Sequence, residues 1–62
     1  MVKCPNCGST AQVRIIQKEH TYSADILLKH NLCTCGCGKR FWYTQGFNEF
    51  GELAKEEYIE CN

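Results

Sequence analysis

Two clusters of cysteine constrain this chain more than any other feature of its sequence. The first cluster is Cys4-Pro5-Asn6-Cys7-Gly8, and the second covers residues 33–38 with the sequence CTCGCG; about 25 residues without cysteine separate them. A structural zinc site takes four ligands, which two tight turns usually supply as two close pairs. The spacing therefore predicts one tetrahedral site that binds one Zn²⁺ per chain and decides the fold.

The length of the chain also favours a metal-dependent fold. A chain of 62 residues buries too little surface for a hydrophobic core to stabilise it alone. No apolar signal segment precedes the first cluster, so we expect a cytoplasmic protein whose cysteines bind metal rather than form disulfides. No apolar run approaches the roughly 20 residues that cross a membrane, so we expect no membrane association. We predict one domain over residues 1–62, with a ribbon at about 3–46 and an acidic C-terminal segment at 47–62.

Charge is distributed unevenly along a chain whose formal net charge is zero. Residues 1–46 carry six basic and two acidic side chains, a net charge of +4, whereas residues 47–62 carry one basic and five acidic side chains, a net charge of −4. The two parts are thus suited to different partners. Four thiolates with one Zn²⁺ would bring the total to about −2, which predicts weak binding to nucleic acid.

Three segments have the composition of β-strands. Residues 11–18 and 26–33 are rich in branched apolar side chains, and residues 40–45, RFWYTQ, give the strongest strand pattern. The polar residues 20–25 indicate a loop. After these strands, apolar residues recur every three or four positions, which predicts a short C-terminal helix; they are Phe50, Leu53, Ala54, Tyr58 and Cys61. The predicted fold is a small metal-stapled β domain, a zinc ribbon with three antiparallel strands and this helix.

The second cluster leaves one ligand ambiguous. Thr34 lies three positions before Cys37 and cannot supply a thiolate, so the partner of Cys37 is either Cys33 or Cys35. In an extended segment, residues two apart have Cα atoms about 6.6 Å apart, which favours Cys33. The predicted ligands are therefore Cys4, Cys7, Cys33 and Cys37, with Cys35 as the alternative to Cys33.

The two glycines that follow cysteines are expected to shape the turns, and three further candidate ligands are expected to stay away from the metal. Gly8 and Gly38 each follow a ligand cysteine, at a position that commonly requires a positive φ. His20 and His30 lie in the predicted loop and in the second strand, and we expect neither to bind the metal. Cys61 is expected to be an incidental thiol.

Both turns resemble those of a known superfamily. Cys4-Pro5-Asn6-Cys7-Gly8 resembles a rubredoxin-type zinc knuckle, and the segment CGKRF at residues 37–41 resembles the second half of another. Residues 3–44 thereby resemble the zinc-ribbon superfamily of transcription factors, ribosomal proteins and small phage proteins. Their layout is similar to that of the Ogr/Delta-type phage zinc-finger transcription activators. The resemblance implies a transcription-associated, DNA-binding function.

The sequence indicates no enzymatic activity. The sequence shows no nucleophile with a base and no glycine-rich phosphate loop, and a four-thiolate zinc has no open position for water. We predict a non-enzymatic zinc-binding module without a small-molecule substrate that binds DNA or RNA. The alternatives are a rubredoxin-like iron electron-transfer protein and a protein–protein adaptor. Basic and aromatic residues are the expected nucleic-acid contacts, although the aromatic ones also fit a small core beside the zinc; they are Arg14, Lys39, Arg40, Trp42 and Tyr43.

Overall fold

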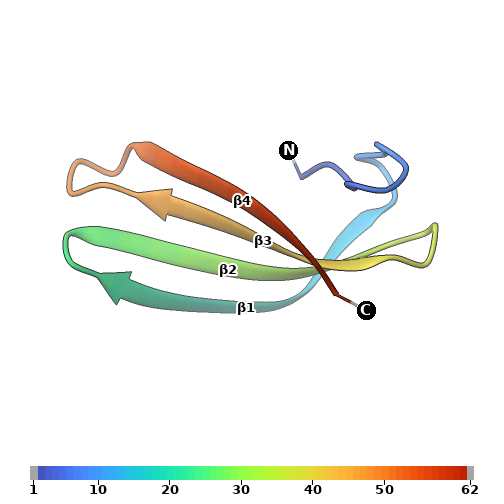
Figure 1. Cartoon of the computed structure of the whole chain (residues 1–62), viewed down its shortest axis with the longest axis horizontal. Helices are drawn as coiled ribbons and strands as arrows, with labels where there is room; N and C mark the ends of the chain where they lie inside the picture. The colour runs from blue at the N-terminus through green and yellow to red at the C-terminus, as the bar shows by residue number, and fades with distance from the viewer. Residues whose placement is uncertain (1, 62) are drawn as a thin grey trace.

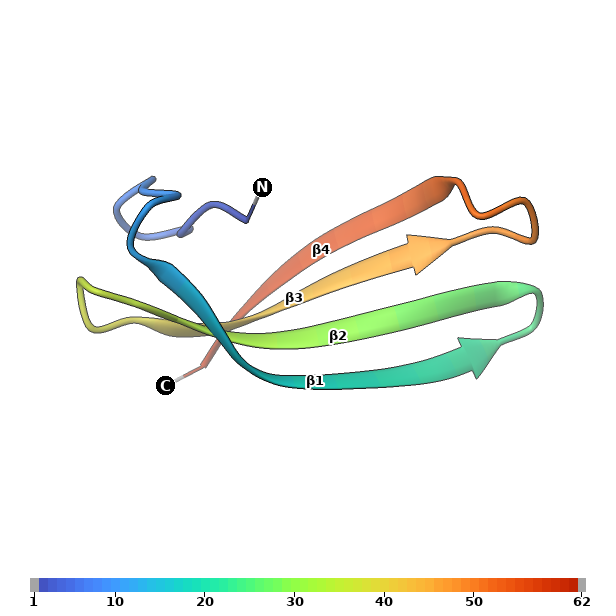
Figure 2. The ribbon, with the colours of Figure 1, turned by 180° about the vertical axis from the view of Figure 1, so that it is seen from behind.

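Four antiparallel strands form a single sheet in the computed structural model, which describes residues 2–61. They are β1 (Val13–Ser23), β2 (Ile26–Cys35), β3 (Arg40–Phe47) and β4 (Leu53–Cys61), and they are neighbours in chain order. The segment before β1 lies beside the β2–β3 turn, at the end of the sheet opposite the β1–β2 and β3–β4 turns (Figures 1 and 2). None of the described residues forms a helix long and apolar enough to cross a membrane.

The predicted strands are present, but the first is longer than expected. Four residues of the segment predicted as a loop, His20 to Ser23, belong to β1 and pair with residues 26–29 of β2. Only Ala24 and Asp25 remain in the turn. Pairing overrides the polar composition here, because Thr21 and Tyr22 are good strand formers that face Leu28 and Leu27 across the ladder.

The predicted C-terminal helix is wrong, because its residues form β4. This strand pairs with β3 from Phe47↔Leu53 to Arg40↔Cys61, and β4 thereby satisfies the backbone groups that β3 would otherwise leave unpaired. The Tyr58 ring lies 4.8 Å from the Tyr43 ring, measured between centroids. Successive side chains of a strand point to opposite faces, so apolar spacings of three and four do not gather on one face of β4 as they would on a helix.

A small core occupies one end of the sheet. It consists of buried Cys4, Cys33, Cys35, Phe41 and Tyr43, with Val2 and Val13 packed against them. Because strand residues alternate in direction, the strand members of this group share one side of the sheet, which we call the core face. The opposite side, the outer face, carries residues such as Leu32, Trp42 and Thr44.

Only part of the core face is covered. We call the covered part the knuckle end (residues 2–16, 31–43 and 58–61) and the remainder the distal half (residues 17–30 and 44–57). In the distal half the sheet is a single layer, and Tyr22 leaves 75% of its surface exposed. The overall dimensions, 36 × 18 × 15 Å, reflect this extension. The N-terminal segment thus positions its cysteines over one end of the sheet alone.

Candidate metal centre

The first turn of the centre is built by the N-terminal segment. The Gly8 amide donates to the Cys4 carbonyl at 2.9 Å, and the Cys4 amide donates to the Ser9 carbonyl at 2.9 Å. Gly8 has φ +77°, which confirms the positive φ predicted from its place after Cys7. Pro5 fixes the backbone within the turn, so Cys4 and Cys7 project toward the same point.

The second turn joins β2 to β3. Cys35 is the last residue of β2; its amide donates to the Lys39 carbonyl, and its carbonyl accepts from the Gly38 amide, both at 2.9 Å. Gly38 has φ +97°, again as predicted. The chain reverses between Cys35 and Cys37, so that their side chains converge although only one residue separates them.

Four sulfur atoms meet where the two turns face each other. The Sγ atoms of Cys4, Cys7, Cys35 and Cys37, which we call the cysteine cluster, all lie within 4.8 Å of one another. Cys4 Sγ is 3.7 Å from Cys37 Sγ, and Cys7 Sγ is 3.5 Å from Cys35 Sγ. Zinc–sulfur bonds of about 2.3 Å place tetrahedral sulfurs about 3.8 Å apart. The spacing therefore fits a four-thiolate metal site.

This grouping corrects the predicted choice between Cys33 and Cys35. Cys33 is fully buried, its Sγ lies 3.6 Å from the Asn31 carbonyl oxygen, and it pairs with Phe41 on β3. Cys33 would be the better partner of Cys37 only if residues 35–37 were extended. Because a turn begins at Cys35, that residue reaches the cluster, whereas Cys33 stays one pleat further inside the sheet.

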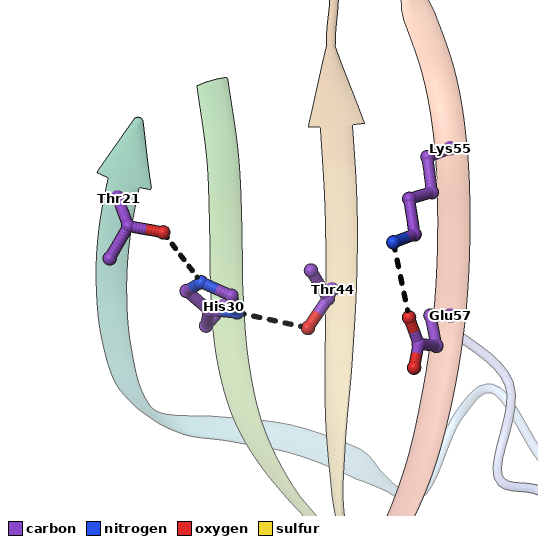
Figure 3. Close-up of polar contacts among 5 residues, drawn as sticks. All are labelled: Thr21, His30, Thr44, Lys55 and Glu57. Atoms are coloured by element: carbon purple, nitrogen blue, oxygen red, sulfur yellow. Dashed lines mark hydrogen bonds and ion pairs between the residues drawn. The ribbon is translucent and has the colours of Figure 1, made fainter. Parts of the chain in front are cut away.

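Neither histidine lies with the cysteine cluster. His20 is exposed on β1, with its ring 6.2 Å from the Tyr22 ring. His30 lies on the outer face of the distal half, where its Nε2 is 3.0 Å from Thr21 Oγ1 and its Nδ1 is 3.1 Å from Thr44 Oγ1 (Figure 3). Both ring nitrogens of His30 are therefore engaged by hydroxyls of neighbouring strands.

The environment of the cysteine cluster favours thiolates unequally. Hydrogen bonds from the Lys39 backbone and the Asn6 side chain lower the pKa of Cys37 to about 6, and Asn6 Nδ2 lies 3.6 Å from Cys37 Sγ. A backbone hydrogen bond from Cys7 lowers the pKa of Cys4. At Cys35 a backbone hydrogen bond from Cys37 opposes the rise, but burial and the neighbouring sulfurs raise the pKa to about 12. A bound cation would displace the remaining protons.

The donor set limits which ions the cysteine cluster could hold. Four thiolates suit Zn²⁺ and also suit iron. The sequence alone did not identify Asn6 as part of this site. Its place between two ligand cysteines was the available signal, because a side chain in a knuckle lies close to the sulfurs of the facing turn.

Three of the predicted nucleic-acid contacts lie together on the outer face. The register aligns Arg14 with Thr34 and Thr34 with Arg40, which places both arginines in one row across β1, β2 and β3. Trp42 occupies the next outer position of β3, since it lies two residues from Arg40. The three side chains therefore lie on one side of the sheet, an arrangement that the sequence alone did not indicate.

Lys39 and the end of β4 complete this surface. A hollow of about 630 Å³ opens beside the second turn, and we call it the basic hollow; its lining residues are Asn6, Leu32, Cys37, Gly38, Lys39, Arg40, Trp42 and Cys61. Cys61, predicted to be incidental, thus lies at the border of the predicted surface. It is half-buried.

Tyr43 does not belong to this surface. It is on the core face, only 4% exposed, and its hydroxyl donates to a Glu56 carboxylate. Strand alternation separates it from Trp42, so the core role considered for the aromatic strand applies to Tyr43 and Phe41. The structure therefore places Tyr43 in the core, on the side of the sheet opposite the other predicted contacts.

Comparisons of the chain with protein families, with characterised proteins and with solved structures found no match. The likeness to a zinc ribbon consequently rests on the cysteine cluster and on the two turns that build it.

Proposed function

We propose that this chain is a non-enzymatic zinc-binding module whose outer face binds nucleic acid. The observation that carries the proposal is the convergence of four cysteine sulfurs within 4.8 Å from two turns about 30 residues apart in the sequence. Zn²⁺ held by these thiolates would supply structural cross-linking rather than Lewis-acid catalysis. It would join the N-terminal segment to the β2–β3 turn and keep that segment over the core.

The distribution of charge on the outer face supports nucleic acid as the partner. Arg14 and Arg40 share one cross-strand row, and Lys39 lies beside Arg40 in the basic hollow. Acidic side chains of the same face occur farther from the turn, where Glu57 forms an ion pair with Lys55 at 3.5 Å (Figure 3). Three cationic side chains are thus gathered on the outer face of the knuckle end, where they could contact phosphates. The four thiolates with Zn²⁺ would add a net charge of −2 beside them, which accords with the weak binding expected from the sequence.

The metal identity is tested by analysing protein purified without added metal. We expect one zinc per chain and no visible absorption, because Zn²⁺ has a filled d shell. Iron at the same stoichiometry, with the visible absorption of a ferric tetrathiolate, would instead support the electron-transfer alternative. Cys35→Ser serves as the control, since loss of one thiolate from a closed site should abolish tight binding of either metal.

Nucleic-acid binding is tested by titrating the zinc-loaded chain with oligonucleotides at low salt. We expect micromolar or weaker binding that weakens further with salt. Replacing both Arg14 and Arg40 by Gln should reduce the affinity and the salt dependence. The matched control replaces Lys18 and Lys29 by Gln, which removes the same charge from the core face of the distal half. An equal loss in both variants would place the contact elsewhere. No binding to any oligonucleotide would favour the protein–protein adaptor.

A further inference from the structure

We infer that the basic hollow binds a single-stranded nucleic acid, with Trp42 stacking on an unpaired base. The inference rests on the proposed nucleic-acid function and narrows it to one class of ligand. It comes from the position of Trp42 between two hollows of the outer face, which a phosphate-binding surface alone would not require.

Trp42 is held in place from both sides. It pairs with Leu32 on β2 and with Ile59 on β4, so its two cross-strand neighbours are apolar, and the side chain is half-buried. The indole contributes to the basic hollow of about 630 Å³ and also to a second hollow of about 230 Å³. It therefore forms a wall that ligands can reach from two directions.

The lining of the basic hollow combines the two groups that a nucleotide requires. Leu32 and Trp42 provide apolar surface for a flat base, while Lys39 and Arg40 provide cations for the adjoining phosphates. Asn6, which also contacts Cys37, adds an amide at the edge of the same hollow.

Stacking on Trp42 discriminates between single and double strands. In a duplex each base already stacks on its neighbours and presents only its edges in the grooves. An unpaired base instead exposes a face that an aromatic side chain can cover. A hollow with an indole wall is therefore better suited to an unpaired base than to the regular outer surface of a duplex.

The second hollow limits the length of the site. It is lined by Glu19, His30, Thr44 and Ile59 in addition to Trp42, and the Glu19 carboxylate repels phosphate. The path of the strand is thus confined to the knuckle end, along the row of Arg14 and Arg40. About two or three phosphate contacts are expected there, which correspond to a salt slope of about −1.4 to −2.1 for a single strand.

The experiment uses the zinc-loaded chain and its own fluorescence, because Trp42 is the only tryptophan. Oligothymidylate and oligouridylate of about ten nucleotides are compared with a duplex of the same length at low salt. We expect both single strands to quench Trp42 and to bind about tenfold more tightly than the duplex. The DNA and RNA arms distinguish the two sources of the same ligand chemistry.

Three variants test the stacking role. Trp42→Leu should weaken binding of the single strands about tenfold while changing duplex binding little, and Trp42→Phe should recover part of the loss. Tyr22→Leu is the matched control, because Tyr22 is an exposed aromatic on the core face of the distal half. Zinc stoichiometry is measured for each variant to establish that the fold is kept.

The outcomes separate this inference from the proposed function. Duplex binding as tight as single-strand binding, with unchanged Trp42 fluorescence, would overturn the inference and leave nucleic-acid binding intact. Equal losses in Trp42→Leu and Tyr22→Leu would do the same. No binding to any of the three oligonucleotides would overturn both. If Trp42→Leu fails to fold, quenching in the unmodified chain decides the question.

Discussion

The knuckle end and the distal half of one sheet differ sharply in what surrounds their strands. At the knuckle end Phe41 and Cys33 are completely buried beneath the N-terminal segment. In the distal half the same strands continue as a single layer, in which Tyr22 and Leu53 leave 75% and 51% of their surfaces exposed. Strand pairing is common to both regions, so the difference lies in the covering layer.

This contrast indicates where the stability of the chain resides. Burial of apolar surface is the main favourable contribution to folding, and here it is concentrated around the cysteine cluster. The segment that provides the cover has no strand of its own among residues 2–12; metal coordination would fix it in place. The core and the metal site should therefore be lost together, whereas changes in the distal half should cost little.

Removal of the metal should have the largest effect. Structural zinc contributes about 10 to 16 kcal/mol in small zinc-finger peptides, more than the stability expected of a chain this short. Chelation should therefore abolish the dispersion of amide resonances in both regions, and added zinc should restore it. If the amide resonances of the distal half stay dispersed after complete removal of metal, the sheet does not depend on the knuckle end for its folding.

The two neighbouring cysteines of β2 should respond differently to substitution. Cys35→Ser removes a sulfur of the cluster and should abolish tight zinc binding. Cys33→Ser should retain one zinc per chain and lose about 1 to 2 kcal/mol of stability, because it changes a buried core side chain. The measurements are zinc affinity by competition and stability by urea unfolding. Loss of zinc from Cys33→Ser with retention by Cys35→Ser would reverse the assignment.

Side-chain truncation compares the regions directly. Phe41→Ala should reduce the free energy of unfolding of the zinc-loaded chain by about 3 kcal/mol, since it removes a fully buried ring. Tyr22→Ala should change it by less than about 0.5 kcal/mol. Urea denaturation of both variants at saturating zinc measures the difference. Similar costs would show that the distal half is also covered in solution.

Alkaline pH should weaken the knuckle end through Tyr43. Burial and the hydrogen bond to Glu56 raise the pKa of Tyr43 to about 12, from an ordinary value of 10.0. A raised pKa favours the neutral phenol in the folded state, so this contribution is complete below pH 10 and is lost as the pH rises toward 12, with about 2 kcal/mol lost by then. Tyr43→Phe is the control: its stability should decline less over this interval, measured by urea unfolding.

A small stabilising effect is expected at the tip of the distal half. Ala24 has φ +54° in the β1–β2 turn, a conformation that is strained for alanine and natural for glycine. Relief of this strain, offset by the greater unfolded-state freedom of glycine, should make Ala24→Gly more stable by about 0.5 kcal/mol. Thermal unfolding at saturating zinc would detect the change, and zinc affinity should stay constant. A change in zinc affinity would show that the β1–β2 turn and the cysteine cluster are energetically coupled, contrary to what their separation in the structure implies.

The sequence predicted the parts of this molecule that local chemistry determines. Cys4 and Cys7 are three residues apart with proline between them and glycine after them, a pattern that forms its turn without help from distant residues. The strand from Arg40 was equally clear, because its aromatic and branched residues leave few alternatives.

The sequence alone could not predict the features that depend on how the strands pair in the folded chain. The charged residues around Tyr58 tolerate a helix or a strand, and only the unpaired edge of β3 selects the strand. Cys33 and Cys35 face the same side of β2, so the choice between them depends on where the turn begins. Trp42 and Tyr43 looked equivalent in composition, yet alternation sends one to the outer face and the other into the core.

The order of the cysteines along the chain has a consequence for how folding proceeds. The two halves of the cluster enclose residues 8–34, and this stretch consists mainly of the β1–β2 hairpin. Closing a loop costs conformational entropy that grows with its length, but hairpin pairing already draws residues 13 and 35 together. A formed hairpin thus raises the local concentration of one cysteine pair around the other, and coordination in turn holds the hairpin ends. Each event makes the other less costly, so hairpin formation and metal capture should occur as one cooperative step.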